Sequence, residues 1–130
     1  MVDREEANLM RRDMDFCIDL LEGFSKGYFK SSFQLRDMDD KFYLYQLELL
    51  RDANLVDYDL LDISGGYGLK YCPKLTWEGN DFLELVENDT ILNKTKEVAK
   101  AKGIELFSLP IDVMKAYLKM QTNNILGIDL

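Results

Sequence analysis

Residues 56–75 read VDYDLLDISGGYGLKYCPKL, a pattern typical of a β-hairpin. The first five of them alternate between apolar and acidic side chains, as in a strand with one buried face. The glycine-rich segment 64–68 predicts the turn, with Tyr67 at its tip, and residues 69–75 predict the returning strand. This segment does not open a helix and lacks the Lys-Ser/Thr pair of a phosphate-binding loop, so we do not expect it to bind phosphate.

A strongly apolar helix is predicted just before the hairpin, from Asp40 to about Ala53, with Asp39 as its N-cap. Its apolar residues cover more than one face, because Tyr43 and Leu44 extend the main stripe around the helix. A helix of this kind is either central in the core or part of an interface.

The N-terminal part of the chain predicts one helix and an irregular link. Apolar residues recur at helical spacing between positions 10 and 21, and glycines at 23 and 27 bracket the expected end. Asp3 followed by Glu6 resembles a capping box, which leaves open whether residues 1–12 belong to this helix or form a separate arm. Residues 24–38 have room for one brief strand.

Three helices are predicted after the hairpin. Their expected caps are Thr76, then Asn88 or Asp89, and finally Ser108 with Pro110. Trp77, the only tryptophan, follows the first cap, and we expect it to be a core wedge at the base of the hairpin. Residues 123–130 predict an apolar tail that either docks on the core or forms a dimer contact.

The predicted order is therefore helix, short strand, helix, β-hairpin and about three more helices, an α+β architecture. A helix that leads into a two-stranded wing is typical of a winged-helix domain, whose middle helix would lie in residues 28–38. The chain of 130 residues has the length of one domain. We expect a winged-helix-like part at 1–75 and a helical part at 76–130.

Several segments of the chain carry a family resemblance. They are Arg12–Asp15, Leu49–Val56, Leu75–Leu83 and residues 89–96, and the Leu-Thr-Trp-Glu-Gly piece at 75–79 is the most specific. Over about residues 11–126 the chain resembles an uncharacterised family of small bacterial proteins, common in phages and prophages of Gram-positive bacteria and described only as a domain of unknown function. The resemblance implies a winged-helix-like fold and a mobile-element origin, and it implies no activity. The acidic residues at 1–10 and the strong negative charge depart from the family pattern.

The residue types exclude several kinds of chemistry. The chain has no histidine, so it lacks the imidazole base of Ser-His-Asp and Cys-His catalysis. Cys17 and Cys72 are too few for a four-ligand zinc site, and we expect two reduced thiols, with one disulfide as the alternative. A carboxylate or Cys72 acting without a base is the weak enzymatic alternative. The sequence predicts no enzyme, no cofactor and no metal site.

The sequence also carries no sign of export or of a membrane. Its N-terminus is acidic and polar, unlike a signal peptide, and its apolar runs are far shorter than the ~20 residues of a spanning helix. We therefore expect a soluble protein in the cytoplasm of a bacterial host cell.

Charge is unevenly distributed along the chain. Lys and Arg number 16 and Asp and Glu number 24, a net charge of −8, with −10 in residues 1–89 and +2 in residues 90–130. The helix and hairpin that would read DNA are acidic and would repel phosphate. We therefore expect a protein-binding module of phage or mobile-element origin that binds or inhibits a host or defence protein through an acidic, aromatic-rich surface. The expected contact residues are Tyr43, Leu44, Asp57, Asp59 and Tyr67.

The alternative is a DNA-binding winged-helix transcriptional regulator. Its phosphate contacts would come from the lysines of the second C-terminal helix, brought together in a homodimer. These lysines are Lys94, Lys96, Lys100 and Lys102. A solvated helix face is the other meaning of such a lysine run.

Overall fold

The computed structural model describes residues 11–127, and the chain divides into two compact units with their boundary between Gly79 and Asn80. The elements of the first unit are α2 (Met14–Ser25), β1 (Ser32–Gln34), α3 (Met38–Asp52), β2 (Val56–Asp57), β3 (Leu60–Ile63), β4 (Gly66–Leu69) and β5 (Lys74–Leu75). Helix α4 (Trp77–Glu87) begins in the first unit and continues into the second. The second unit adds α5 (Asp89–Ala101), a short 3-10 helix η1 (Leu106–Ser108) and α6 (Ile111–Leu126). The predicted α+β class and the order of elements are confirmed.

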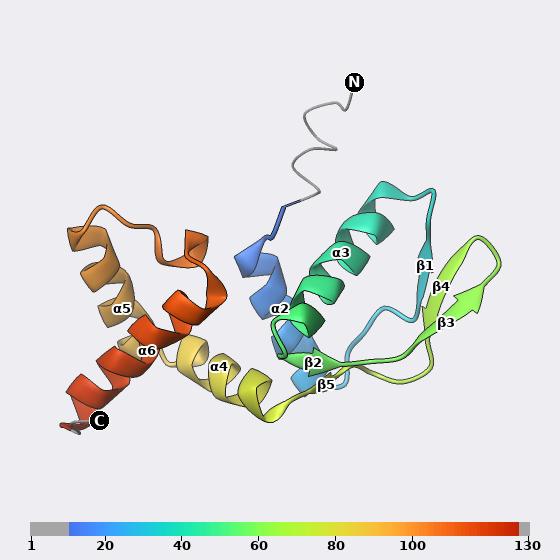
Figure 1. Ribbon diagram of the computed structural model, residues 1–130. Coiled ribbons are helices and arrows are strands. Elements are labelled where there is room, and N and C mark those ends of the chain that lie inside the picture. The colour runs from blue at the N-terminus through green and yellow to red at the C-terminus, as the bar shows by residue number, and fades with distance from the viewer. Residues whose placement is uncertain (1–10, 128–130) are drawn as a thin grey trace. The chain divides into compact units, whose positions relative to one another are not determined.

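The strands of the first unit form two small antiparallel sheets (Figure 1). One sheet has the order β1-β4-β3, and the other pairs β2 with β5. The short β1 places Phe33 in the core with only 1 % of its surface exposed. Residues 28–38 thus contain β1 where a winged-helix domain has its middle helix.

Helices α2 and α3 pack together over the core (Figure 1). Asp13 caps α2 by accepting from the Phe16 N–H, so residues 11–13 do not continue this helix. They are held instead by the fully buried Gln46 of α3. Its amide oxygen accepts from the Asp13 N–H at 2.8 Å, and its amide nitrogen donates to the Arg11 carbonyl at 2.7 Å. The capping box expected at Asp3 and Glu6 lies outside the described residues.

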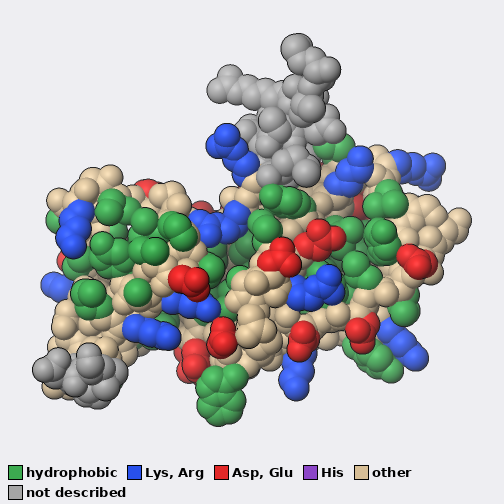
Figure 2. All heavy atoms as spheres, in the orientation of Figure 1, with side chains coloured by type: hydrophobic (Ala, Val, Ile, Leu, Met, Phe, Trp, Pro, Cys, Tyr) green, Lys and Arg blue, Asp and Glu red, His purple; other side chains and the backbone are tan. Residues whose placement is uncertain are grey.

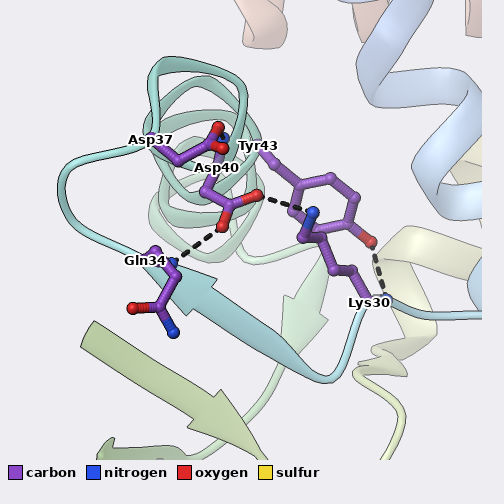
Figure 3. Close-up of polar contacts among 5 residues, drawn as sticks. All are labelled: Lys30, Gln34, Asp37, Asp40 and Tyr43. Atoms are coloured by element: carbon purple, nitrogen blue, oxygen red, sulfur yellow. Dashed lines mark hydrogen bonds and ion pairs between the residues drawn. The ribbon is translucent and has the colours of Figure 1, made fainter. Parts of the chain in front are cut away.

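The N-cap predicted for α3 is wrong by two residues. Asp37 caps this helix, because its carboxylate accepts from the Asp40 N–H at 3.1 Å. Asp39 is exposed in the first turn of the helix. Asp40 is turned towards β1, where it accepts from the Gln34 N–H at 2.8 Å and pairs with the Lys30 ammonium at 2.6 Å (Figure 3). We call Lys30, Gln34, Asp37, Asp40 and Tyr43 the β1 seam.

The segment Leu75–Gly79 forms the corner between β5 and α4. The Thr76 hydroxyl donates to the Asn54 carbonyl at 2.6 Å and accepts from the Gly79 N–H at 2.9 Å, which confirms Thr76 as the predicted cap. Gly79 is required by close approach, since a Cβ there would lie 2.0 Å from the Leu55 carbonyl oxygen. The Asn54 amide also donates to the Glu78 carboxylate at 3.2 Å.

The second unit is built on α5 and α6. Asn88, one of the two expected caps, caps α5 by accepting from the Ile91 N–H at 3.0 Å. Residues 123–126 are wrongly predicted as a tail, because α6 continues to Leu126 and ends at Gly127 in the left-handed conformation. Residues 128–130 lie outside the described part. Over the residues described, the helices are too short or too polar to cross a membrane.

Candidate functional site

The hairpin of the first unit carries apolar and acidic side chains together on its surface. Its exposed residues include Asp57, Asp59, Leu61, Asp62, Ile63 and Tyr71, which we call the hairpin surface. Lys70 and Lys74 of the returning arm are also exposed, so the net charge of the exposed hairpin residues is −1. Leu61 is 45 %, Ile63 41 % and Tyr71 69 % exposed. Figure 2 shows that acidic side chains of the first unit lie next to hydrophobic ones. Apolar groups exposed in this way are typical of protein-binding sites.

Two glycines of β4 shape one face of this sheet. The register places Gly66 opposite Ile63 and Gly68 opposite Leu61, so β4 contributes no side chain to the face that carries these two residues. Gly66 also permits a close strand approach, because a Cβ there would lie 1.7 Å from the Phe33 carbonyl oxygen. The glycine-rich segment is therefore mostly strand, and only Ser64 and Gly65 form the turn.

The hairpin is open in its middle. The β2–β5 ladder ends with Asp57 opposite Lys74, and the β3–β4 ladder begins with Leu60 opposite Leu69. Residues 58–59 on one side and 70–73 on the other lie outside both ladders. A hollow of about 380 Å³ lies at this opening. It is lined by Asp57, Tyr58, Asp59, Tyr71, Cys72 and Lys74.

Tyr58 is the unusual member of the hollow. Among the described residues, its phenol oxygen is the buried side-chain polar atom that lacks a hydrogen-bond partner. Burial raises the pKa of Tyr58 to about 12, so the phenol stays protonated at neutral pH. The guanidinium of Arg51 lies 4.3 Å from the centroid of its ring.

The two thiols do not support a catalytic role. Cys17 and Cys72 are both free, and burial raises the pKa of Cys17 to about 12. Burial also raises the pKa of Cys72, whose sulfur lies 3.6 Å from the Phe24 carbonyl oxygen. A thiol with a raised pKa is mostly protonated at neutral pH and is a poor nucleophile.

Of the expected contact residues, Asp57 and Asp59 line the hollow, while the two residues of α3 pack inward. Leu44 is only 8 % exposed, so we remove it from the contact set, because its side chain is used by the core. Tyr43 is half-buried, its ring packs against Phe33 with centroids 5.2 Å apart, and its hydroxyl accepts from the Lys30 N–H at 3.4 Å (Figure 3). The sequence could not separate these inward positions from outward ones, since the helix is apolar on several sides.

Tyr67 is not at the tip of the hairpin as predicted. It lies within β4, half-buried, opposite Phe33 of β1 and Asp62 of β3. The aromatic residue that stands out from the hairpin is Tyr71, which the sequence analysis missed. Tyr71 lies in the longer of the two unpaired segments, which has four residues against two on the other arm. This difference in length appears only once the strand pairing is known.

Trp77 is also placed wrongly by the sequence. It is 84 % exposed instead of being a core wedge. At 100° per residue, Gly79, Phe82 and Val86 lie about 140–200° around α4 from Trp77. These three residues are buried, which leaves Trp77 on the opposite side of the helix.

The four predicted lysines are all exposed, three of them in α5 and Lys102 as its C-cap, but they do not share one face. Thr95 and Ala99 form the buried stripe of this helix, and Lys96 and Lys102 lie on its two sides by helical geometry. The Lys96 ammonium lies 4.6 Å from the Phe107 ring centroid, and that of Lys102 lies 5.6 Å from the Tyr117 ring centroid. The helix therefore presents no single flat row of four lysines to a phosphate backbone.

Comparisons with known proteins place the chain among uncharacterised proteins. An uncharacterised protein of Haemophilus influenzae (strain ATCC 51907 / DSM 11121 / KW20 / Rd) is 30 % identical over 69 residues, which are 52 % of this chain and 57 % of the relative. The chain thus spans little more than half the length of that relative. No solved structure matches the chain. The family model described as "Hypothetical protein (DUF2513)" matches residues 11–105, and the chain therefore belongs to the DUF2513 family.

Proposed function

We propose that this protein is a non-enzymatic protein-binding module whose hairpin surface docks on a basic patch of a partner protein. The observation that carries the proposal is the exposure of Leu61, Ile63 and Tyr71 on the same hairpin as three exposed aspartates. Apolar side chains supply the buried area of an interface, and charge directs the encounter.

The scaffold we propose is winged-helix-like. The order α2, β1, α3 and hairpin supports this, and the occurrence of β1 in place of a middle helix makes it a variant of that scaffold. In a DNA-reading winged helix, α3 would present basic or amide side chains to base edges. The exposed charged side chains of α3 are Asp39, Glu48 and Asp52 against Lys41 and Arg51. Their net charge of −1 supports a protein partner over a duplex.

The resemblance to phage and prophage proteins suggests the class of partner. A host or defence protein with a basic nucleic-acid groove would attract the acidic hairpin, and occupying that groove would inhibit the partner. Long-range attraction of this kind raises the association rate and weakens as salt rises.

The test is an affinity capture from bacterial lysate in nuclease-treated and untreated halves. The bait is compared with a double variant, Asp57→Lys with Asp59→Lys, and with a matched control, Asp15→Lys with Asp19→Lys, which reverses two exposed charges of α2. We expect a protein that survives nuclease treatment, is kept by the control and is lost by the hairpin variant. Equal capture by both variants would contradict the proposal.

A DNA-binding regulator is the second candidate, and its support is the exposure of Lys94, Lys96 and Lys100 on α5 and of Lys102 at its C-cap. It predicts material captured only in the untreated half and lost in Lys96→Glu with Lys100→Glu, which lie one helical turn apart. Binding to duplex DNA that falls steeply with salt would favour this candidate. Absence of duplex binding at low salt would exclude it.

A further inference from the structure

The hollow in the hairpin has features of a site for one particular side chain. Its volume of about 380 Å³ lies near the small end of the ~300–1,000 Å³ typical of ligand pockets. It arises because two residues on one arm and four on the other separate the ladders, as in a large bulge. The opening is thus set by backbone register and not by the rotamer of one side chain.

The carboxylates of the hollow favour a ligand that donates hydrogen bonds and carries positive charge. Asp57 and Asp59 contribute two carboxylates, which at neutral pH only accept hydrogen bonds. The Tyr58 oxygen is itself buried and lacks a partner among the described residues, so the acceptors that a ligand in the hollow can reach are the carboxylate oxygens. An anion would be repelled here, and an apolar group would leave these oxygens without donors.

The aromatic walls favour a planar cation. Tyr71 is 69 % exposed, and the Lys70 ammonium lies 5.5 Å from its ring centroid, so a ligand cation would share this ring with Lys70 or displace it. The ring of Tyr58 already has the Arg51 guanidinium against it from the α3 side. A guanidinium stacks on such rings and donates through a rigid fork to carboxylates, whereas an ammonium is compact and more strongly hydrated.

Lys74 also lines the hollow and faces Asp57 across the β2–β5 ladder. Its ammonium is a competing cation beside the two carboxylates. Among the residues that line the hollow, two carboxylates and one ammonium give a net charge of −1. The cations of Arg51 and Lys70 lie against the rings of Tyr58 and Tyr71, so an incoming guanidinium competes with them as well as with Lys74.

We propose that the hollow binds the guanidinium of an arginine side chain that the partner presents to the hairpin surface. The proposal rests on the proposed function, because it names the side chain of the basic partner that this surface recognises. Carboxylates of Asp57 and Asp59 would accept from the guanidinium, and Tyr71 would cover its face.

The experiment is an NMR titration of the full ¹⁵N-labelled chain with N-acetyl-L-arginine N-methylamide. The comparison ligands are the matching citrulline derivative, which has the same shape without charge, and the lysine derivative. We expect saturable shifts confined to the amides of residues 57–59 and 70–74. Affinity for the citrulline derivative should be weaker by at least roughly fivefold, the factor that about 1 kcal/mol of a single ion pair gives, and the lysine derivative should also bind more weakly.

Variants assign the binding to the hollow. Asp59→Asn should weaken arginine binding by roughly fivefold, and Lys74→Gln should strengthen it by removing the competing cation. Asp62→Asn is the matched control, because Asp62 is an exposed aspartate of β3 outside the hollow, and it should change the affinity by less than about twofold. Unchanged spectra outside the hairpin show that each variant remains folded.

Three results would overturn the proposal. They are equal binding of arginine and citrulline, equal losses in Asp59→Asn and Asp62→Asn, and shifts that map away from the hollow or fail to saturate. Each is distinguishable from failure of the proposed function. A captured partner that depends on Asp57 and Asp59, combined with no arginine binding, would keep the docking surface and reject the arginine site.

Discussion

The β1 seam and the hollow are both polar regions of the first unit, and they differ in how their groups are satisfied. In the seam, the Asp40 carboxylate accepts from Gln34 and pairs with Lys30, and Tyr43 accepts from the Lys30 backbone. In the hollow, the carboxylates of Asp57 and Asp59 line an opening between two ladders, and the hydroxyl of Tyr58 is buried without a partner among the described residues. Polar groups that bind one another hold the fold, whereas exposed carboxylates with spare bonding capacity are available to a ligand.

The largest expected effect on stability is at Gly66, where β4 lies close to β1 beside the seam. Gly66→Ala would place a Cβ 1.7 Å from the Phe33 carbonyl oxygen, so β1 and β4 must separate. We expect a loss of at least about 3 kcal/mol in the free energy of unfolding, the upper end of ordinary overpacking. Urea unfolding followed by circular dichroism measures it.

Gly68→Ala is the matched control in the same strand. Its Cβ would meet the Ser31 carbonyl oxygen at 3.4 Å and Ile63 Cγ2 at 3.5 Å, which are van der Waals distances. Its stability should stay within about 1 kcal/mol of the wild type. Equal losses in the two variants would show that glycine matters in β4 for another reason than the approach to β1.

Two tyrosines test the comparison directly. Tyr43→Phe removes the acceptor of the Lys30 N–H and should cost about 1 kcal/mol of unfolding free energy, the usual net value of one hydrogen bond. Tyr58→Phe removes a hydroxyl that has no partner among the described residues, so stability should be unchanged or slightly higher. A larger loss in Tyr58→Phe than in Tyr43→Phe would break the distinction between seam and hollow.

The seam also predicts a dependence of stability on pH. The hydrogen bond from Lys30, followed by that from the Gln34 N–H, lowers the pKa of Asp40 below its ordinary value of 3.8. Because the folded pKa is the lower one, the contribution of Asp40 is present above the unfolded pKa and is lost as pH falls through the folded pKa. The hydrogen bond to Asp40 raises the pKa of Lys30 above 10.5, so the contribution of Lys30 is lost as pH rises through that raised value.

Urea midpoints measured between about pH 2 and pH 7 test this linkage. The wild type should lose stability on the acid side more steeply than Asp40→Asn. Asp39→Asn serves as the control, since Asp39 is exposed in the same turn of α3. If the urea midpoint falls equally steeply at acid pH in all three proteins, the role of Asp40 is refuted.

A small effect on stability is also expected at Trp77. With 84 % of its surface exposed, Trp77→Ala should change the free energy of unfolding by no more than about 0.5 kcal/mol. As the only tryptophan, it should give red-shifted emission that acrylamide quenches readily in the folded protein. Blue-shifted, protected emission would instead support the core wedge that the sequence predicts.

The sequence alone determined the order of elements and the starts of α4 and α5, because caps and periodicity are local signals. Ser108, which was expected to cap the last helix with Pro110, lies instead in the short 3-10 helix. The hydroxyl of Thr76 and the amide of Asn88 act within three residues of their own positions, so neighbouring sequence suffices to find them. The acidic alternation of residues 57 and 59 likewise placed two residues of the hollow.

Only the tertiary structure decided which sides of these elements face outward. Leu44, which was expected on the surface, is buried, and Trp77, which was expected in the core, is exposed. The buried side of a helix depends on what packs against it. The hollow depends on the pairing of Asp57 with Lys74, 17 positions apart, and of Leu60 with Leu69, 9 positions apart, and no local pattern encodes this register. Strand register is settled by burial of the whole hairpin at once, and so the opening, Tyr71 and the unpartnered hydroxyl of Tyr58 emerge only when the chain is folded.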